Sequence, residues 1–166
     1  MHFNNVKCSF TFKNSLIEDG NTKRQLLYKI DKVKISIYAH SPTFLNATGL
    51  QSSKDIEHYK NLFEKKYSQK CEKVKIDNVF VSKKDFKNID MHKVFYYIKE
   101  CHGDTYRVEY NIELFPGMFL YPKQKHYPNV LLFRTASYQM MGGCNNEGLL
   151  KTRKFIEQII HMFCKN

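Results

Sequence analysis

The sequence predicts an α+β fold built from two similar halves, each a curved antiparallel sheet with helices on one side. Three observations predict it: segments with the two-residue alternation of strands, helices marked by caps and helical periodicity, and an order of elements that occurs twice. The chain has 166 residues, of which 42% are apolar and 14% aromatic, so it can bury one sizeable core or two small halves that share one.

The repeat begins with two similar stretches. NNVKCSFTF at residues 4–12 resembles DNVFVSKKDF at 77–86, with matching Asn-Val pairs that start at Asn5 and Asn78. Later, residues 32–66 are echoed by residues 129–160: each has a strand, a turn, a second strand that ends at Gly49 or Gly143, and then a helix. We therefore expect a first repeat at 1–72, with a shortened start, and a second at 73–166, which together form one domain.

One strand of the first repeat is expected in VKISIY, residues 33–38. Its aliphatic residues alternate with Lys34, Ser36 and Tyr38. The aliphatic side must meet the helices, which leaves Lys34, Ser36 and Tyr38 on the open side of the sheet.

The matching strand of the second repeat is expected in NVLLF, residues 129–133, and is apolar on both sides. Val130 and Leu132 point one way, whereas Leu131 and Phe133 point the other. If one side packs on helices, the other side is an apolar surface available to a ligand or a partner.

Three helices are expected. The first follows the capping-box pattern of Ser52 and Asp55, the second runs from about Asp90 to Cys101 and stops at Gly103, and the third lies near the end of the sequence. The residues of their inward stripes are, in order, Ile56, Tyr59, Phe63 and Tyr67; Met91, Val94, Phe95 and Ile98; and Leu149, Thr152, Ile156, Ile159, Ile160 and Phe163.

Composition narrows the class of protein. Lys and Arg outnumber Asp and Glu by 27 to 16, and the resulting net charge of +11 favours a polyanionic partner. The five cysteines form no C-x-x-C motif and no zinc-ligand spacing, so we expect them to be reduced and structural. No apolar run is long enough to span a membrane, and the first residues do not resemble a secretion signal. These features predict an intracellular protein without metal or cofactor.

Two short motifs invite a catalytic interpretation, and the residues argue against both. Cys101, His102 and Asp104 are residue types that a thiol hydrolase uses, but neighbours at a helix end point apart, and a helix C-terminus disfavours a thiolate. Gly142 and Gly143 precede a helix but lack the Lys-Ser/Thr of a phosphate-binding loop. The sequence therefore predicts a protein that is not an enzyme.

A Phe-Pro-Gly turn interrupts the apolar run YNIELFPGMFLYP, residues 110–122, and puts Phe115 at a tight turn. This run, followed by NVLLF, resembles the second repeat of the TATA-box-binding protein family, in which a Glu-Leu-Phe-Pro-Gly turn precedes a strand. KIDNVFVS at 75–82 and ATGL at 47–50 resemble two further motifs of the family. The resemblance covers most of the sequence between residues 33 and 160.

The resemblance implies a pseudo-twofold saddle whose concave sheet sits on a widened DNA minor groove, with no catalysis and no cofactor. In the family, pairs of phenylalanines wedge into the two end steps of the site and kink the DNA. Phe115 and Phe133 stand at the wedge positions of the second repeat, one residue further apart than in the family, and Leu131 falls at an adjacent groove contact. The alternative is that both phenylalanines are core residues.

The resemblance also implies roles at the centre and the flanks of the sheet. Asn5 and Asn78 would donate hydrogen bonds to the acceptors that A·T pairs present on the groove floor, although Asn is also common at strand starts and turns. Phe80 shares a strand face with Asn78 and would meet the groove. Lys34 would hold phosphates, which positions the protein without specifying a sequence.

The first repeat departs from the family pattern. Tyr38 occupies the later wedge position, Ser36 stands where Leu131 stands, and the earlier wedge position falls near residues 25–27. Thr48 keeps a groove-contacting position that MMGG, residues 140–143, lacks in the second repeat, whereas Asn46 replaces a Val. These changes predict a divergent protein with weakened selectivity for TATA sequences.

The resemblance extends to partners. In the family, an acidic-Leu-Phe-Pro-Gly turn binds transcription factor IIB; Glu113 and Leu114 match this turn, and Asn111 replaces an acidic residue. The implied partners are double-stranded DNA of AT-rich promoters, a factor IIB-like protein and the RNA polymerase initiation machinery. The alternative is a protein-interaction module of the same fold that has lost its own DNA binding.

The abundance of Lys, Asn and Ile suggests an AT-rich genome, such as that of a protist or a large DNA virus. The expected location is accordingly the nucleus, or a viral replication compartment if the protein is viral.

Overall fold

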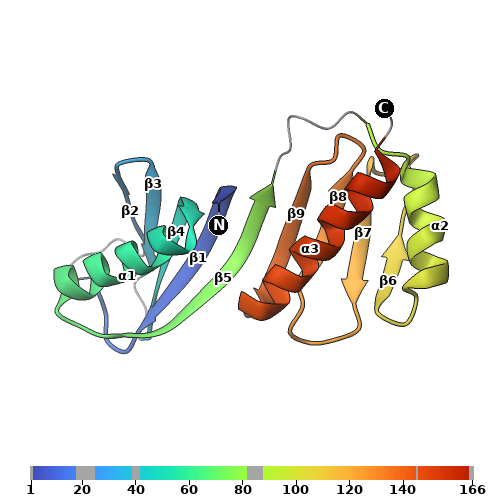
Figure 1. Ribbon diagram of the computed structural model, residues 1–166. Coiled ribbons are helices and arrows are strands. Elements are labelled where there is room, and N and C mark those ends of the chain that lie inside the picture. Colours follow the sequence, from blue (N-terminus) through green and yellow to red (C-terminus); the bar gives the residue numbers. More distant parts are fainter. Residues whose placement is uncertain (1, 18–24, 39–41, 82–87, 145, 165–166) are drawn as a thin grey trace. The chain divides into compact units, whose positions relative to one another are not determined.

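The computed structural model describes residues 2–17, 25–38, 42–81, 88–144 and 146–164, which belong to two compact units, Met1–Val79 and Phe80–Asn166. Figure 1 shows the helices and strands of both units. The boundary between the units lies within strand β5 (Cys71–Val81). The second sequence repeat is expected to begin in the same strand, at residue 73.

The first unit is a sheet covered on one face by helix α1 (Ser53–Tyr67), which lies across the strands in Figure 1. Hydrogen bonding gives the strand order β2-β3-β4-β1-β5. The pairs β1–β4, β3–β4 and β2–β3 are antiparallel. Besides β5, the strands are β1 (His2–Phe12), β2 (Gln25–Ile30), β3 (Val33–Tyr38) and β4 (Thr43–Ser52).

The face of this sheet that α1 covers forms the core of the unit. Its buried residues alternate along the strands and are Val6, Cys8, Phe10 and Phe12 of β1, Val33, Ile35 and Ile37 of β3, and Leu45, Ala47 and Leu50 of β4. Phe10 packs edge-to-face on Phe63 of α1, with 5.3 Å between the ring centroids. Each large side chain buried in this way contributes roughly 1.5–3 kcal/mol to the free energy of unfolding. The predicted alternation of residues 33–38 is confirmed.

Both ends of α1 have the caps that favour a helix. The Asp55 N–H donates to Ser52 Oγ at 3.2 Å, and the Ser52 N–H donates to the Asp55 carboxylate at 3.0 Å. This reciprocal capping box satisfies two backbone donors that the first turn leaves unpaired, and it confirms the prediction for this helix. At the other end, Ser68 adopts the left-handed conformation and its N–H donates to the Glu64 carbonyl.

The second unit combines an antiparallel sheet with two helices. Its strands are β6 (Tyr106–Glu109), β7 (Gly117–Pro122), β8 (Asn129–Phe133) and β9 (Tyr138–Cys144), in the order β9-β8-β7-β6. Helix α2 (Met91–Cys101) begins after its N-cap Asp90, and helix α3 (Asn146–Phe163) follows β9. Both predicted helices of this half are therefore present. Among the helices that the structure describes, none has the length and apolar character needed to cross a lipid bilayer.

One face of the second sheet packs against the helices. Its buried residues are Met118, Leu120, Val130, Leu132, Tyr138 and Met140. The Tyr106 ring stacks on Phe155 of α3 at 5.0 Å, and the Tyr138 hydroxyl donates to Glu157 of α3 at 3.3 Å. These contacts hold α3 on this face. In each unit we call the opposite face of the sheet the open face.

Candidate nucleic-acid interface

The open face of the second unit carries two aromatic rings at the Phe-Pro-Gly turn. Phe115 in the turn and Phe133 on β8 lie with their ring centroids 6.1 Å apart, and we call them the aromatic pair. Gly117 pairs directly with Phe133 in the β7–β8 ladder. A Cβ atom at Gly117 would lie 2.7 Å from Phe115 Cε1 and 3.1 Å from Phe133 Cε1, so only glycine leaves room for both rings as they stand. The structure thus brings the two predicted wedge residues together.

Leu131 lies beneath the aromatic pair. Its Cδ1 would be 2.6 Å from the same Cβ position, so Leu131, Phe115 and Phe133 converge on one point. Leu131 is only 7% exposed, whereas Phe115 is 40% exposed. The sequence predicts Leu131 as a groove contact; in the structure it lies next to the aromatic pair and is mostly covered.

The aromatic surface extends along β7 beyond the residues that sequence reasoning found. Phe119 lies 5.6 Å from Phe115, measured between ring centroids, and Tyr121 stacks on Phe119 at 5.9 Å. The guanidinium of Arg107 lies over the Tyr121 ring at 4.6 Å. The alternation of GMFLYP, in which Met118 and Leu120 are buried, was the signal that could have placed these rings on the open face.

The open face of the first unit is mostly polar and basic instead. Strand register arranges its side chains in rows that cross β1, β4, β3 and β2. One row consists of Lys7, Thr48, Lys34 and Lys29, and the next consists of Ser9, Asn46, Ser36 and Leu27. Tyr38, opposite Gln25, lies one step further along β3. The predicted residues Lys34, Ser36, Tyr38 and Thr48 therefore share this face, as their strand positions indicate.

Two glycines with positive φ show which residues of the two repeats are equivalent. Gly49 has φ 109° and Gly142 has φ 102°, so Gly142, and not Gly143, is the equivalent of Gly49. By the same offset, Met141 occupies the position of Thr48. The prediction that Gly143 matches Gly49 is therefore wrong by one residue. A shift of one residue between two aligned strands leaves their residue types similar, so the sequence does not reveal it. The loss of the threonine in the second repeat still holds.

The register also places the missing wedge position of the first repeat. Ser36 pairs with Asn46 as Leu131 pairs with Gln139, which confirms that Ser36 stands where Leu131 stands. Tyr38 pairs with Gln25 as Phe133 pairs with Gly117. The equivalent of Phe115 is therefore residue 23, two residues before the start of the predicted range 25–27, and it lies outside the described residues.

Two exposed apolar side chains of the first unit were missed by sequence reasoning. Phe44 on β4 is 45% exposed between the buried Thr43 and Leu45, and Leu27 on β2 is 70% exposed. Leu27 is the register equivalent of Phe119 in the second unit. Alternation within TFLNATG could have revealed Phe44, because Leu45 and Ala47 face the core.

Asn5 and Asn78 have different surroundings. Asn5 is exposed and lies where the β1–β4 ladder is irregular, and its Oδ1 accepts from the Gly49 N–H at 3.0 Å. A bulge of this kind can re-aim a side chain. Asn78 is partly buried, and its Oδ1 has no hydrogen-bond partner among the described groups.

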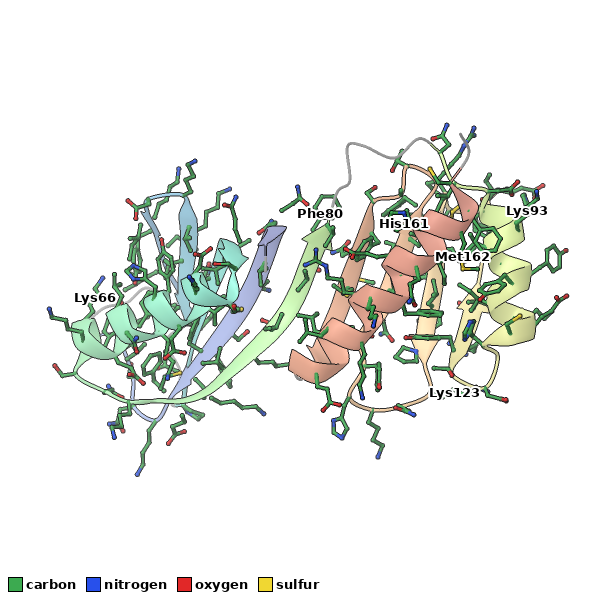
Figure 2. The ribbon with its side chains drawn as sticks, viewed as in Figure 1. Lys66, Phe80, Lys93, Lys123, His161 and Met162 are labelled. Atoms are coloured by element: carbon green, nitrogen blue, oxygen red, sulfur yellow. The ribbon has the colours of Figure 1, made fainter. Side chains whose placement is uncertain are left out.

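Phe80 lies near the C-terminal end of β5, where it is labelled in Figure 2. It is 36% exposed, whereas its neighbours Val79 and Val81 are buried. Phe80 therefore points away from the buried side of the strand, as its predicted role requires.

The turn that precedes β7 is ordered by Asn111. Its carbonyl accepts from the N–H groups of Leu114 and Phe115 at 3.2 and 2.9 Å, and its Oδ1 accepts from the Glu113 N–H at 3.1 Å. These bonds project Leu114 into solvent, where it is 83% exposed. Glu113 is exposed beside it. Asn111 can thus replace an acidic residue here, because the turn uses a side-chain oxygen.

His102, the candidate base of the Cys-His motif, packs among aromatic side chains. His102 Nε2 lies 3.4 Å from the Tyr97 hydroxyl, and its ring packs edge-on against Phe155 at 4.9 Å. These contacts make His102 part of an aromatic cluster. No group of three or more His, Cys, Asp or Glu side chains in the described parts of the chain could hold a metal ion.

No family model and no curated protein matches this sequence. Among solved structures, the chain is similar to the TBP of Methanococcus jannaschii, with a TM-score of 0.56 and 19% sequence identity over 96% of this chain and 97% of that chain. The chain has the TATA-box-binding protein fold. The predicted fold class is thus confirmed.

Within this TATA-box-binding protein fold, the two repeats have diverged on their open faces. At equivalent register positions, the second repeat has Phe119, Leu131 and Phe133 where the first has Leu27, Ser36 and Tyr38. The aromatic surface therefore belongs to the second repeat, and the lysine row belongs to the first.

Proposed function

We propose that this protein binds double-stranded DNA in the minor groove of AT-rich promoters, bends it, and acts as a general transcription initiation factor. The observation that carries the proposal is the aromatic pair, which meets over Gly117 on the sheet face that α2 and α3 do not cover. The TATA-box-binding protein fold supports it, and so does the net charge of +11.

The aromatic pair has the chemistry of a wedge. Inserting an apolar side chain between two base pairs costs a few kcal/mol of stacking, which the contact between rings and bases offsets. Phe115 is 40% exposed and is supported by Leu131 below it, so the rings project from a packed base. Such support limits the conformational entropy lost on insertion.

The first repeat would contribute less to kinking. Tyr38 carries a hydroxyl that is unfavourable between stacked bases unless it is paired. The row of Lys7, Lys34 and Lys29 instead suits phosphate oxygens. Lys29 and Lys34 are directly opposite each other, an arrangement of like charges that destabilises a sheet unless an anion lies nearby. We therefore propose one strong kink, under the second repeat.

The central asparagines fit this use of the minor groove. The Gly49 N–H can only donate, so it fixes Asn5 with its oxygen inward and leaves the NH₂ group to donate to A·T acceptors. We assign the same role to Asn78. Phe80 and Thr48 are proposed as further groove contacts.

The exposed turn is the proposed site of a factor IIB-like partner. Glu113 and Leu114 are both exposed there, held by the bonds to Asn111. Through this partner the protein would recruit the RNA polymerase initiation machinery. The proposed location is the nucleus, or a viral replication compartment.

A second candidate is a protein-interaction module of the same fold, working within a transcription complex without binding DNA by itself. This second candidate is favoured by the polar open face of the first repeat and by the burial of Leu131, which is only 7% exposed. The two functions differ in salt dependence. For DNA binding, log K falls with log salt concentration by roughly 0.9 per phosphate contact, whereas docking of an apolar peptide is insensitive to salt.

The test measures binding and bending together. A duplex with a central AT-rich element carries fluorophores at its two ends, and energy transfer is recorded during titration at two salt concentrations. F115A and F133A are compared with Y96A, which removes a ring that is 58% exposed on α2.

We expect salt-sensitive binding with a change in end-to-end distance for the wild type and Y96A. Both phenylalanine variants should bend the DNA less while associating at a similar rate. Equal bending by all four proteins would refute the wedge assignment. Absence of binding at low salt would favour the protein-interaction module.

A further inference from the structure

Three polar side chains that are distant in sequence meet on the open face of the first unit. Ser9 Oγ lies 2.9 Å from Asn46 Oδ1 and within hydrogen-bond distance of the Asp77 carboxylate. Ser9 and Asn46 are paired in the β1–β4 ladder, and Ser36 pairs with Asn46 from the other side. The contact with Ser9 therefore brings the carboxylate to the same polar row.

The carboxylate has acceptor capacity left over. Its two oxygens offer about four lone pairs, and the single Ser9 hydroxyl proton can occupy only one. Lys75 Nζ lies 3.7 Å from Asp77 Oδ1, which is an ion pair but longer than a hydrogen bond. The Asp77 side chain is 20% exposed, and its contact with Ser9 is the observation that puts it beside the open face.

A carboxylate on this face is unsuited to a groove floor made only of A·T pairs. Those pairs present acceptors alone, which would oppose the carboxylate oxygens, whereas a G·C pair adds the guanine N2 amino group as a donor. The same side chain can therefore favour one base pair and disfavour another, because acceptors face acceptors in the second case. At the position equivalent to Ser36, the second unit has the apolar Leu131.

We propose that Asp77 is a specificity residue that accepts a hydrogen bond from a guanine amino group under the first repeat. Ser9 orients the carboxylate, and Lys75 offsets its repulsion from the phosphates. The preferred site is then AT-rich under the second repeat with one G·C pair under the first, which gives the protein a direction on the DNA. This inference rests on the proposed binding of duplex DNA in the minor groove.

The test changes only the minor-groove amino group of a base pair and keeps the rest of the duplex. A G·C pair is moved step by step through an AT-rich duplex to find the position of highest affinity. At that position guanine is replaced by inosine, which lacks only the amino group, and in a second duplex adenine is replaced by 2,6-diaminopurine, which adds it to an A·T pair. Dissociation constants are measured for the wild type, D77N, D77A and the control D104N, which neutralises an exposed carboxylate of the second unit.

We expect the wild type and D104N to bind the guanine duplex about tenfold more tightly than the inosine duplex, the size of one good base contact. Diaminopurine should tighten binding to a similar extent. In D77A the ratio should fall to within about twofold of unity, because no side-chain acceptor remains, and D77N, whose amide oxygen can still accept, should fall between D77A and the wild type. A merely structural role of Asp77 would lower the thermal stability of these variants and leave the ratio unchanged.

Two results overturn the inference. If D77A keeps the wild-type ratio of guanine to inosine affinity, or if the wild type itself prefers inosine, Asp77 does not read the amino group although the protein binds DNA. If the wild type binds none of the duplexes at low salt, the proposed function fails, and this inference fails with it.

Discussion

The side-chain oxygen of Asn5 accepts a 3.0 Å hydrogen bond from the backbone N–H of Gly49. Because a backbone N–H can only donate, this bond sets the orientation of the amide and directs its NH₂ group away from the Gly49 N–H. One side chain thus has an oxygen with a structural contact and an NH₂ group that we propose binds DNA, and substitutions can separate the two roles.

Asn5→Asp keeps the oxygen that faces Gly49 and removes the NH₂ group. We expect its free energy of unfolding to stay within about 0.5 kcal/mol of the wild type, as for a surface substitution, while DNA affinity falls by about tenfold or more. Asn5→Ala, which removes both atoms, should also lose about 1 kcal/mol of stability. Urea denaturation and fluorescence anisotropy measure the two effects. An N5D variant that binds DNA like the wild type would contradict the donor role.

Two glycine-to-alanine substitutions should have opposite consequences. At Gly117 the new methyl group meets the movable side chains of Leu131, Phe115 and Phe133, so we expect nearly unchanged stability but displaced rings and reduced DNA bending. At Gly49 the methyl group would lie 2.9 Å from the Lys32 carbonyl, and φ is +109°. G49A should therefore lose more than about 1 kcal/mol. Thermal denaturation and energy transfer distinguish the pair; full bending by G117A would contradict the packing of the rings.

The capping box of α1 makes a stability prediction. Ser52→Ala removes the acceptor for the Asp55 N–H and should cost about 1 kcal/mol. Asp55→Asn weakens the return bonds to Gln51 and Ser52, and the double variant should lose less than the sum of the two single variants. Ser53→Ala, at the next and exposed position, serves as the control. Additive losses in chemical denaturation would mean that the two bonds act independently.

Leu114 should affect partner binding and not DNA binding. It is 83% exposed in a turn that backbone bonds to Asn111 hold, so L114A removes apolar contact area without unfolding the turn. We expect weaker capture of a factor IIB-like protein on preformed DNA complexes, measured by mobility shift, with unchanged DNA affinity. Met162, 56% exposed on α3 and labelled in Figure 2, provides the control variant M162A. Equal capture by L114A and wild type would move the partner site elsewhere.

The cysteines should differ in reactivity. Burial, together with the nearby Asp77 carboxylate, raises the pKa of the Cys8 thiol to about 12, whereas Cys101 is exposed. At pH 8 an alkylating reagent should therefore modify Cys101 and leave Cys8 intact until the protein is unfolded, as peptide mass spectrometry can show. Modification of Cys8 in the native protein at the rate of Cys101 would contradict its burial.

The same shift predicts a loss of stability at alkaline pH. Above pH 9 the unfolded chain loses the Cys8 proton while the native state retains it up to about pH 12, so the unfolded state binds fewer protons and the free energy of unfolding falls as pH rises. C8A should show a shallower fall than the wild type over this range in urea denaturation.

Some features of this protein follow from the sequence alone because they depend on neighbours. Alternation placed Lys34, Ser36 and Tyr38 on an open face, the pattern of Ser52 and Asp55 marked the start of α1, and the Phe-Pro-Gly turn pointed to its fold. Each is a local property of a few residues, whose spacing along the chain determines which side of a strand or helix they occupy.

Other features were decided only by the tertiary structure. Strand register showed that Gly142 matches Gly49 and that residue 23 matches Phe115, and packing placed Leu131 beneath the aromatic pair. The meeting of Ser9 with Asp77, 68 residues away in sequence, is of the same kind. Residue types constrain such contacts weakly, because a slip of register changes the partners of every side chain while each strand keeps its own alternation.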